Sequence, residues 1–556
     1  MIVGDSLTKE TPIHSQVQPI WLIKCIYNIG WGKGVSVKRI AHPELFFGLV
    51  APVGVDLDMI MEVLSTELTL QKYSAFPIHI TEIMQDVPSN LVLKNETYLD
   101  RINSRIEYAD EICSRIERED ALAAIAITAI QSVRERLNRE LAERAAEKLP
   151  SDARLLQERL QLPIPKQAYL IRQFKRPKEI GLLRQVYGKL FFQISAYSSP
   201  AERELLLKKK IKASNFGGLE DSEAECQAIS LMAKDYQEAD KPYGQQIRET
   251  FPLGDVFVDG VNRKNCEAMI KRFVNLIFGD NSLTPDHHEY GMYLAKSAAL
   301  RSGDLSRQVG AAIFRASGEV ATLGCNEVPK YGGGSYWSDG SEDRRDFALG
   351  EDPNERIKRE ILHDILETLF ERKKLAEQIN SIAAVRDIMQ DDALRKSKVM
   401  DLLEFGRVIH AEMSAITDAA RLGIKIKSGT LFCTTFPCHI CAKHIVASGI
   451  DTVVFLEPYP KSYARELHSD SIEIEGDEEI AKVKFTPFLG ISPLRYRDFF
   501  EKGRRKDKET GKIIRWTAGI GVPIIEIYYA VYINLETLVS NELKQDKRLR
   551  ERPALS

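Results

Sequence analysis

The sequence predicts an α/β protein with two domains in one chain, and three observations support this prediction. At 556 residues the chain is too long for one ordinary domain of about 150 residues. Hydrophobic residues make up 44% of it and charged residues 28%, as in soluble globular proteins. Apolar strand-like runs alternate with amphipathic helical segments in the first half, and the alternation returns between residues 405 and 460. We therefore expect a first domain over 1–260, a second over 261–540 and a charged tail over 541–556.

Charge and hydropathy exclude several classes of protein. The 77 basic and 80 acidic side chains give a formal net charge of −3, which argues against coating nucleic acid through an overall positive field. The most apolar run, residues 45–55, is far shorter than the ~20 apolar residues of a membrane helix. Residues 1–18 lack the basic start and apolar core of a signal peptide. We therefore expect a cytoplasmic protein without a membrane segment.

A strand, a glycine-containing turn and a helix form the first motif of the chain. Residues 44–50 are a candidate buried strand, and residues 57–68 are a candidate amphipathic helix. A phosphate-binding loop has the same parts and the pattern G-x-x-x-x-G-K-[ST]. When the second glycine of this pattern is aligned with Gly54, the position of the lysine is occupied by Val55. Phosphate binding here would depend on backbone N–H groups and the helix dipole, and an ordinary βα turn is the alternative. The candidate nucleotide-loop residues are Gly48, Gly54 and Asp56.

The segments that follow continue the α/β pattern. Residues 98–149 have helical spacing, and residues 167–180 predict a strand that runs into a helix with an Arg-Pro-x-Glu start. Residues 188–197 predict another strand, followed by a helix that contains Arg203. In this order the segments resemble P-loop nucleotide kinases over about residues 44–258. The resemblance implies a P-loop-like parallel α/β domain with a degenerate phosphate loop, suited to nucleotide sensing or partner docking rather than ATP hydrolysis.

The second domain is predicted to contain an insertion. Residues 255–260 predict the last strand of the first domain, and a helix over 264–278 opens the second. Residues 331–404 begin as a Gly- and Asp-rich loop, of a kind that often forms functional lids, and return to helical spacing, so we expect a helical insertion there. The basic runs at 504–508 and 544–552 are typical of solvated surface, with nucleic-acid binding as the alternative.

The strongest chemical signal is an H-x-E motif followed by P-C-x-x-C in the second domain. Zinc prefers four tetrahedral N and S ligands, and a catalytic zinc keeps one position open for water. His410, Cys438 and Cys441 supply three ligands. The two cysteines share one face of a helix predicted over 437–448, and a helix N-terminus favours their thiolate forms. We therefore predict one catalytic Zn²⁺ ion per chain.

Glu412 is the candidate general base and acid of this site. A fourth protein ligand would close the site, so we assign Glu412 to moving protons from the attacking water to a ring nitrogen and a leaving amine. A structural zinc site or a redox pair is the alternative. A structural site would need a fourth ligand, but the nearby Cys433 lies on a predicted strand from which its side chain should enter the core. His439 and His444 are more typical of packed or solvated residues.

Together the two motifs form the signature of zinc-dependent nucleobase deaminases, and two upstream segments resemble deoxycytidylate deaminases. Residues 302–313 contain S-R-x-V-G-A, and residues 324–329 contain G-x-N-x-x-P. The resemblance implies a cytidine-deaminase-like three-layer α/β/α domain in which Asn326 contacts the deoxyribose. It also makes Ser306 and Arg307 candidates for sugar or phosphate contacts, because the planar guanidinium can donate two hydrogen bonds to phosphate. A surface turn is the alternative for these two residues.

Most of the chain resembles the bacterial anti-phage dCTP deaminases, in which a P-loop-like N-terminal half is fused to a deoxycytidylate deaminase domain. The residues that carry this resemblance, besides the zinc motif, are Asp235 and the stretches 243–246, 250–252, 332–337, 345–347, 457–462, 467–471 and 487–490. The resemblance implies conversion of dCTP and dCMP to dUTP and dUMP upon infection, a homo-oligomer such as a hexamer and, in some members, inhibition by a small RNA. One departure is the 84-position separation of Asn326 and His410, which is longer than in plain deoxycytidylate deaminases.

Three other functions are alternatives to this interpretation. The first is a housekeeping dCMP deaminase with a regulatory N-terminal domain. The second is a nucleic-acid editing enzyme, which would need aromatic stacking platforms in a basic groove and agrees less well with a net charge of −3. The third is a non-enzymatic interaction module that holds a structural zinc ion.

Overall fold

The structure is a computed structural model with an α/β fold built on two six-stranded sheets. It describes residues 38–549 except for 216–217, 237, 239–240, 242, 341, 376–381, 396, 403, 459–461 and 476–480. Residues 1–18, which lack a signal-peptide pattern, and the last residues of the expected tail therefore lie outside the described residues. None of the described helices is both long and apolar enough to cross a membrane.

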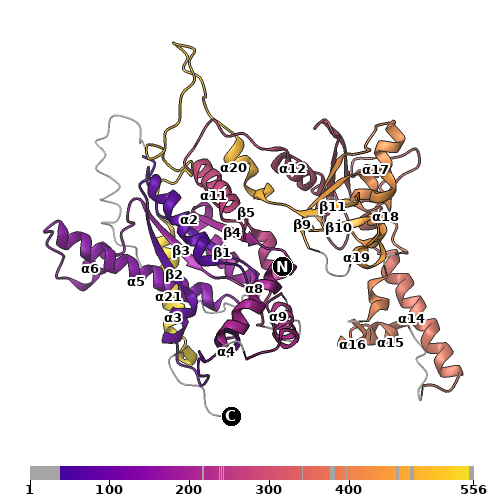
Figure 1. Cartoon of the computed structure of the whole chain (residues 1–556), viewed down its shortest axis with the longest axis horizontal. Helices are drawn as coiled ribbons and strands as arrows, with labels where there is room; N and C mark the ends of the chain where they lie inside the picture. The colour runs from indigo at the N-terminus through magenta and orange to yellow at the C-terminus, as the bar shows by residue number, and fades with distance from the viewer. Residues whose placement is uncertain are drawn as a thin grey trace, which may run out of the picture.

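The first sheet has the strand order β12-β5-β4-β1-β3-β2 and lies left of centre in Figure 1. Its strands β1 to β5 are parallel, and β12 is antiparallel to β5. The chain passes from β1 to the far edge at β2 and returns through β3, and β4 then continues on the other side of β1. The turn after β1 therefore lies where the strand order reverses, at the carboxyl ends of the strands. The strands are β1 Leu45–Val50, β2 Ser74–His79, β3 Gln167–Arg172, β4 Phe191–Tyr197, β5 Val256–Asp259 and β12 Gly490–Ile491.

Helices cover both faces of the first sheet because successive strand residues point to opposite faces. On one face Phe46 packs against Tyr187 of α7 and Tyr532 of α21. On the other face its neighbour Phe47 packs against Phe273 of α11. The helices around this sheet are α2 Leu57–Leu70, α3 Ile80–Ile83, α4 Tyr98–Ile116, α5 Ala121–Arg144, α6 Ala153–Leu160, α7 Pro177–Tyr187, α8 Pro200–Ser214, α9 Asp221–Tyr236, α10 Ile247–Thr250, α11 Arg263–Ile277, α20 Tyr496–Phe500 and α21 Tyr532–Gln545.

The packing differs from the expected domain boundaries at 260/261 and 540/541. Helix α11, expected to open the second domain, buries its apolar face on the first sheet. Strand β12 pairs with β5, and α21 packs against α5 and α7, so the C-terminal part of the chain also returns to the first sheet (Figure 1). The first packing unit therefore combines residues 38–280 with residues 490–549. An amphipathic helix must bury its apolar face, but its periodicity does not specify the sheet that covers it.

The second sheet has the strand order β10-β11-β9-β8-β6-β7. Strands β6 and β7 form an antiparallel hairpin, β6 is antiparallel to β8, and β8, β9, β11 and β10 are mutually parallel in that order. The strands are β6 Gly310–Phe314, β7 Val320–Cys325, β8 Thr430–Thr435, β9 Thr452–Glu457, β10 Ile472–Ile474 and β11 Val483–Pro487. The helices packed on or beside it are α12 His287–Ala299, α17 Ala411–Leu422, α18 His439–Ser448 and α19 Ala464–Leu467.

The second sheet is the middle of three layers. Leu431 and Cys433 of β8 share a core with residues of α17 and α18. Phe432, between them, belongs to the core on the opposite face together with Met292 of α12. The strand alternation thus produces the predicted α/β/α arrangement and, as predicted, buries Cys433 completely.

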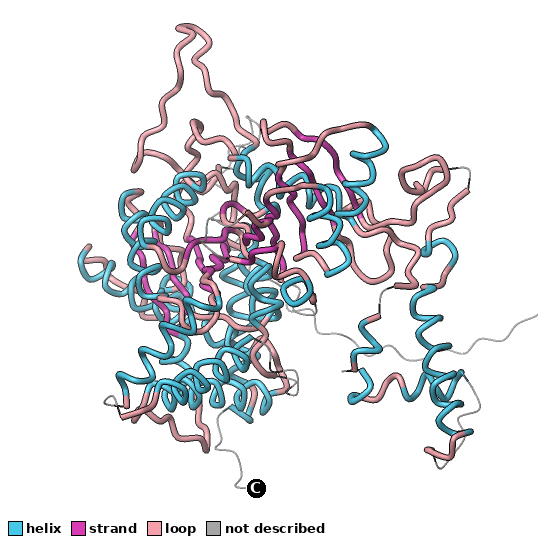
Figure 2. Tube along the Cα trace, turned by 45° about the vertical axis from the view of Figure 1, so that its right-hand side comes forward, coloured by secondary structure: helices cyan, strands magenta, loops and turns pink. Residues whose placement is uncertain are grey.

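Helices α14, α15 and α16 of the predicted insertion lie apart from both sheets in Figure 1, and the separate helical part is also visible in Figure 2. Helix α14 is the longest of them, and it forms a small apolar cluster with the following helices through Leu362, Val385 and Met389. These helices are α13 Asp346–Leu349, α14 Pro353–Glu371, α15 Ile382–Ile388 and α16 Asp392–Arg395.

Candidate metal centre and active site

Two helix N-termini bring the three predicted zinc ligands together. His410 is the N-cap residue of α17, and it follows the bridge between Ile409 and Glu327 that ties this segment to the end of β7. Cys438 is the N-cap residue of α18, which begins at His439 rather than at the expected Pro437. Its sulfur accepts a hydrogen bond from the backbone N–H of Cys441 at 3.5 Å. The motif spacing therefore places all three side chains at the starts of two neighbouring helices.

The geometry of these ligands fits a zinc ion. His410 Nδ1 lies 3.3 Å from Cys438 Sγ and 3.3 Å from Cys441 Sγ. Tetrahedral zinc with bonds of about 2.3 Å to sulfur and about 2.0 Å to nitrogen requires N···S separations of about 3.5 Å. The hydrogen bond between the two side chains lowers the pKa of Cys438 to about 4 and raises the pKa of Cys441, so Cys438 is the thiolate of the pair in the absence of a metal. One imidazole and two sulfurs thus form a compact three-ligand group.

Glu412 lies beside this group without joining it. In the described part of the chain, the ligand atoms that cluster within 4.8 Å here belong to His410, Cys438 and Cys441. Glu412 is in the first turn of α17 and is 4% exposed. Burial in this position raises the pKa of its carboxyl group. The carboxyl group therefore lies beside the candidate metal position without belonging to the ligand cluster.

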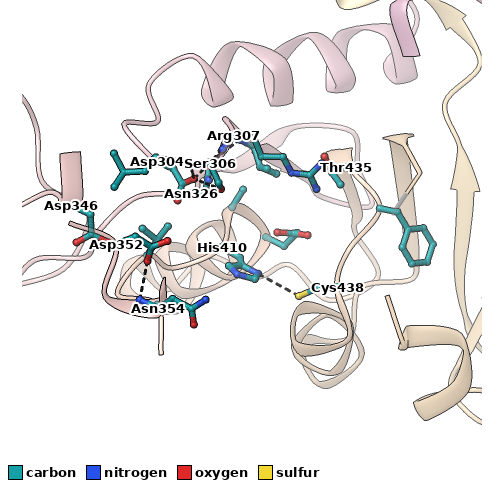
Figure 3. A pocket seen from close by; sticks show the side chains of 17 residues that line it. Asp304, Ser306, Arg307, Asn326, Asp346, Asp352, Asn354, His410, Thr435 and Cys438 are labelled. Carbon is teal, nitrogen blue, oxygen red and sulfur yellow. Dashed lines mark hydrogen bonds between the residues drawn. The ribbon is translucent and has the colours of Figure 1, made fainter. Parts of the chain in front are cut away.

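A cavity of about 370 Å³, here called the zinc-site cavity, opens in front of the ligand group (Figure 3). His410, Glu412 and Cys438 line its base, and all three predicted substrate residues line its wall. The predicted substrate residues are Asn326, Ser306 and Arg307. Motifs separated by more than 80 positions in the sequence thus converge on one cavity.

Asn326 holds one wall of the zinc-site cavity in place. Its Oδ1 accepts a hydrogen bond from the backbone N–H of Val309 at 2.7 Å, and its Nδ2 donates to the carbonyl of Arg307 at 2.8 Å. The side chain of Asn326 is only 7% exposed, but it lines the cavity. The amide oxygen and the amide nitrogen of Asn326 therefore both hold the neighbouring loop in place.

The loop that Asn326 orders also contains Ser306 and Arg307. The Ser306 hydroxyl donates to Asp304 Oδ1 at 2.6 Å, and the same oxygen accepts from the backbone N–H of Arg307 at 3.1 Å. The Arg307 guanidinium lies 4.0 Å from Glu457 Oε2 at the end of β9. Its half-exposed position at the mouth of the cavity agrees with a contact to a charged ligand group.

Several lining residues escaped prediction from the sequence. Asp346, Asp352 and Asn354 come from the insertion, and Figure 3 shows them on the side of the cavity away from Cys438. Asp346 accepts a hydrogen bond from Arg407 at 2.7 Å, and Asn354 donates to the carbonyl of Leu402 at 2.9 Å. Only the Gly- and Asp-rich composition of the insertion pointed to a functional loop, and it did not distinguish these three residues. Their approach to the site is a tertiary contact.

The three candidate nucleotide-loop residues have local structural roles in the first sheet. A side chain at Gly48, inside β1, would place its Cβ 2.7 Å from the ring of Phe191. Gly54 has φ +101° and lies against Arg203 of α8. Asp56 is the N-cap residue of α2 and accepts hydrogen bonds from the next helical N–H groups. A backbone turn with these roles agrees with the βα-turn alternative.

An internal carboxylate occupies the turn after β1. The backbone N–H of Val53 donates to Asp235 Oδ2 at 2.6 Å. Lys175 Nζ donates to Asp235 Oδ1 at 2.5 Å and to the carbonyl of Ala51 at 2.8 Å. Asp235 is 2% exposed. A lysine therefore does lie beside the turn, but it is Lys175, which follows β3, and not a residue of the turn itself. This lysine is paired with Asp235.

The fold and the ligand group together define an α/β/α domain with a candidate metal site. Residues 285–457 match the family model of the cytidine and deoxycytidylate deaminase zinc-binding region. The matched segment contains all three ligands and Glu412.

Individual relatives match shorter stretches. The chain is 36% identical over 83 residues to ComE operon protein 2 of Bacillus subtilis (strain 168), covering 14% of this chain and 44% of that protein. It is 48% identical over 54 residues to the deoxycytidylate deaminase of Enterobacteria phage T2, covering 10% of this chain and 29% of that protein. The chain thus spans less than half the length of these curated relatives.

The apo dCMP deaminase of cyanophage S-TIM5 is 16% identical with a TM-score of 0.20, over 37% of this chain and 99% of that chain. The same enzyme in complex with dCMP and dUMP is 17% identical with a TM-score of 0.20, over 37% of this chain and 98% of that chain.

Proposed function

We propose that the second domain catalyses the zinc-dependent hydrolytic deamination of deoxycytidine nucleotides. The observation that carries the proposal is the group of His410, Cys438 and Cys441 beside the buried Glu412 at the base of one cavity. Three ligands leave a zinc ion one open position, as a catalytic site requires. The donor set therefore supports catalysis better than it supports a purely structural metal site.

The proposed reaction assigns separate steps to the bound metal and to Glu412. Bound zinc would supply a Lewis acid that makes water nucleophilic at neutral pH. Glu412 takes a proton from the attacking water and delivers protons to the ring nitrogen N3 and to the amine that leaves C4. The amine leaves as ammonia, and the product is the corresponding uracil nucleotide. The buried position of Glu412 keeps the carboxyl group next to the reacting atoms and away from bulk water.

The proposed substrates are dCTP and dCMP, which become dUTP and dUMP. Relatives named deoxycytidylate deaminase support the deoxycytidine nucleotide class. We assign Asn326 and Ser306 to the sugar side of the substrate and Arg307 to its phosphate. A housekeeping dCMP deaminase, regulated by the N-terminal domain, is the alternative, and the relative consumption of dCTP and dCMP distinguishes the two.

The biological role that we propose is depletion of the dCTP pool during phage infection, in the cytoplasm and by a homo-oligomer. In this proposal the N-terminal domain is P-loop-like and regulatory, and a small RNA is its candidate inhibitor. These points derive from the resemblance of the whole chain to anti-phage dCTP deaminases. Nucleotide pools measured in infected and uninfected cells that express the chain test the role directly.

Glu412→Gln is the variant that tests the chemistry. We expect it to retain one zinc per chain and its thermal stability while kcat for dCMP and dCTP falls by about 10²- to 10⁴-fold, because glutamine cannot move a proton. Ammonia release measures the activity, and elemental analysis measures the zinc. Glu466→Gln is the matched control, since Glu466 is exposed on α19 outside the zinc-site cavity. A Glu412→Gln protein with full zinc and full activity would refute the proposed role of this residue.

A further inference from the structure

A second cavity, of about 450 Å³, lies between the two sheets and has no role in the proposed reaction. We call it the inter-sheet cavity. Pro52 and Tyr197, which follow β1 and end β4, contribute to it from the first sheet. Phe455 near the end of β9 and Pro487 at the end of β11 contribute to it from the second. Carboxyl ends of parallel strands therefore meet there from both sheets, and this is the position where α/β sheets bind ligands.

The walls of the inter-sheet cavity are mostly apolar and aromatic. Tyr236 of α9, Phe251 and Phe455 line it, together with Met232 and Ala233 of α9. Apolar and aromatic walls that surround a few polar groups are typical of small-molecule sites. Aromatic rings in such a cavity can stack on a flat heterocycle.

Arg203 is a buried polar residue in this cavity, and its Nε is unsatisfied. It is 8% exposed, and its buried Nε has no hydrogen-bond partner. Throughout the part of the chain that the structure describes, no ion pair engages its guanidinium either. Asp235, the acidic residue whose charge acts most strongly on Arg203, is already hydrogen-bonded to Lys175 and to the backbone N–H of Val53. A buried guanidinium without a partner is uncommon, because its desolvation is not compensated.

Two further polar groups line the inter-sheet cavity beside Arg203, namely the Tyr197 hydroxyl and the Glu475 carboxyl group. Tyr197 and Glu475 interact with each other, while Glu475 Oε2 is buried without a hydrogen bond of good geometry. Glu475 follows β10 of the second sheet. A buried guanidinium from the first sheet's side and a carboxyl group from the second sheet's side therefore line the same aromatic cavity.

We propose that the inter-sheet cavity binds the base of a small nucleotide. The base stacks on the aromatic walls, Arg203 donates to ring nitrogen or carbonyl acceptors at its edge, and Glu475 accepts from an adjacent N–H or amino group. Nucleobases present acceptors and donors side by side on one planar edge, and arginine and glutamate side chains recognise such edges. The proposal concerns binding alone and does not depend on the deamination proposed above.

The position of this cavity connects it with the zinc-site cavity. Phe455, which lines the inter-sheet cavity, packs edge to face on Phe436 at 5.0 Å between ring centroids. Phe436 lines the zinc-site cavity. An occupant would therefore be a second ligand, separated from the metal centre by one pair of rings.

Calorimetric titration of the zinc-loaded full chain with GMP, AMP and dTMP tests the proposal. We expect at least one of these nucleotides to bind with Kd below about 1 mM, and Arg203→Gln to weaken that binding about tenfold or more because a charge-assisted hydrogen bond is lost. Arg307→Gln is the matched control, because Arg307 lies at the other cavity. It should leave binding of the same nucleotide unchanged.

A second variant keeps the test decisive if Arg203→Gln does not fold. Ala233→Trp fills the inter-sheet cavity from α9 and should abolish binding while far-UV circular dichroism stays that of the wild type. The proposal is wrong if none of the three nucleotides binds the wild-type chain. It is also wrong if binding survives in the folded Arg203 and Ala233 variants, or is lost in Arg307→Gln instead.

Discussion

At the scale of single residues, His410 and Glu412 illustrate how the start of a helix can serve a metal site. Side chains two positions apart do not share a helix face. Because His410 is the N-cap residue and Glu412 is in the first turn of α17, both nevertheless reach one cavity. The H-x-E spacing already required this arrangement, and the structure provides it.

Asn326 orders the loop beside the cavity and is also a proposed substrate contact. We therefore predict the effect of removing its side-chain amide. Asn326→Ala removes the hydrogen bonds to Val309 and Arg307. With about 1 kcal/mol for each hydrogen bond, we expect kcat/KM for dCMP to fall about 10- to 100-fold. Zinc content should not change, because Asn326 does not touch the ligand group. Steady-state kinetics with elemental analysis measures both quantities.

Asn541→Ala provides the control for this prediction, since Asn541 is exposed on α21 and distant from the zinc-site cavity. Its kinetics should match those of the wild type. Loss of zinc in Asn326→Ala would contradict the role assigned here and would place Asn326 among the residues that support the metal.

At the scale of elements, the contact between α17 and β7 depends on Gly324. A Cβ at this position would lie 2.2 Å from the carbonyl oxygen of Ala411 and 2.6 Å from the backbone nitrogen of Ala415. The contact involves helix backbone, so it cannot be relieved by a side-chain rotation. The glycine of the G-x-N-x-x-P motif therefore sets the distance between β7 and the helix that carries Glu412.

We expect Gly324→Ala to displace α17 and to disturb the metal site. Overpacking of this kind costs about 1–3 kcal/mol of unfolding free energy, and the displaced His410 should also lower the zinc content. Denaturant unfolding and elemental analysis measure the two effects. Gly181→Ala is the control: Gly181 lies in α7, nothing surrounds its Cβ position, and alanine there should be neutral or stabilising. Equal effects of the two substitutions would contradict the close-approach argument.

At the scale of the whole molecule, one buried ion cluster joins the beginning and the end of the described chain. Arg134 of α5 lies 2.9 Å from Glu44 Oε2 and 2.5 Å from Glu536 Oε2 of α21, and all three side chains are fully buried. Tyr532 donates a further hydrogen bond to Glu44 at 2.9 Å. The C-terminal helix is therefore part of the first packing unit through Tyr532 and Glu536.

Removal of the cation at the centre of this cluster should destabilise the first packing unit strongly. Arg134→Ala leaves two buried carboxylates unpaired, which costs about 3–5 kcal/mol. Urea unfolding followed by circular dichroism measures the loss. Arg136→Ala, two positions further along α5 and on its exposed side, removes a 57% exposed guanidinium and should change stability by less than about 0.5 kcal/mol. Similar losses in both variants would show that the cluster does not stabilise the fold.

The sequence alone determined the parts of this protein that depend on local spacing. Strand alternation and helical periodicity specified β1, β8 and α2 because each pattern reports the faces of its own element. Zinc chemistry and the H-x-E and P-C-x-x-C spacings specified the ligand group because helix starts deliver side chains at short, fixed separations.

Tertiary structure decided which other elements these helices and strands pack against. Periodicity shows that α11 and α21 bury an apolar face, but the covering sheet lies far away in the sequence. Likewise, Asp235 reaches the turn after β1 from α9, and Asn354 reaches the zinc-site cavity from the insertion. Such contacts join residues tens to hundreds of positions apart, and the free energy that selects them comes from burial and pairing in the complete fold.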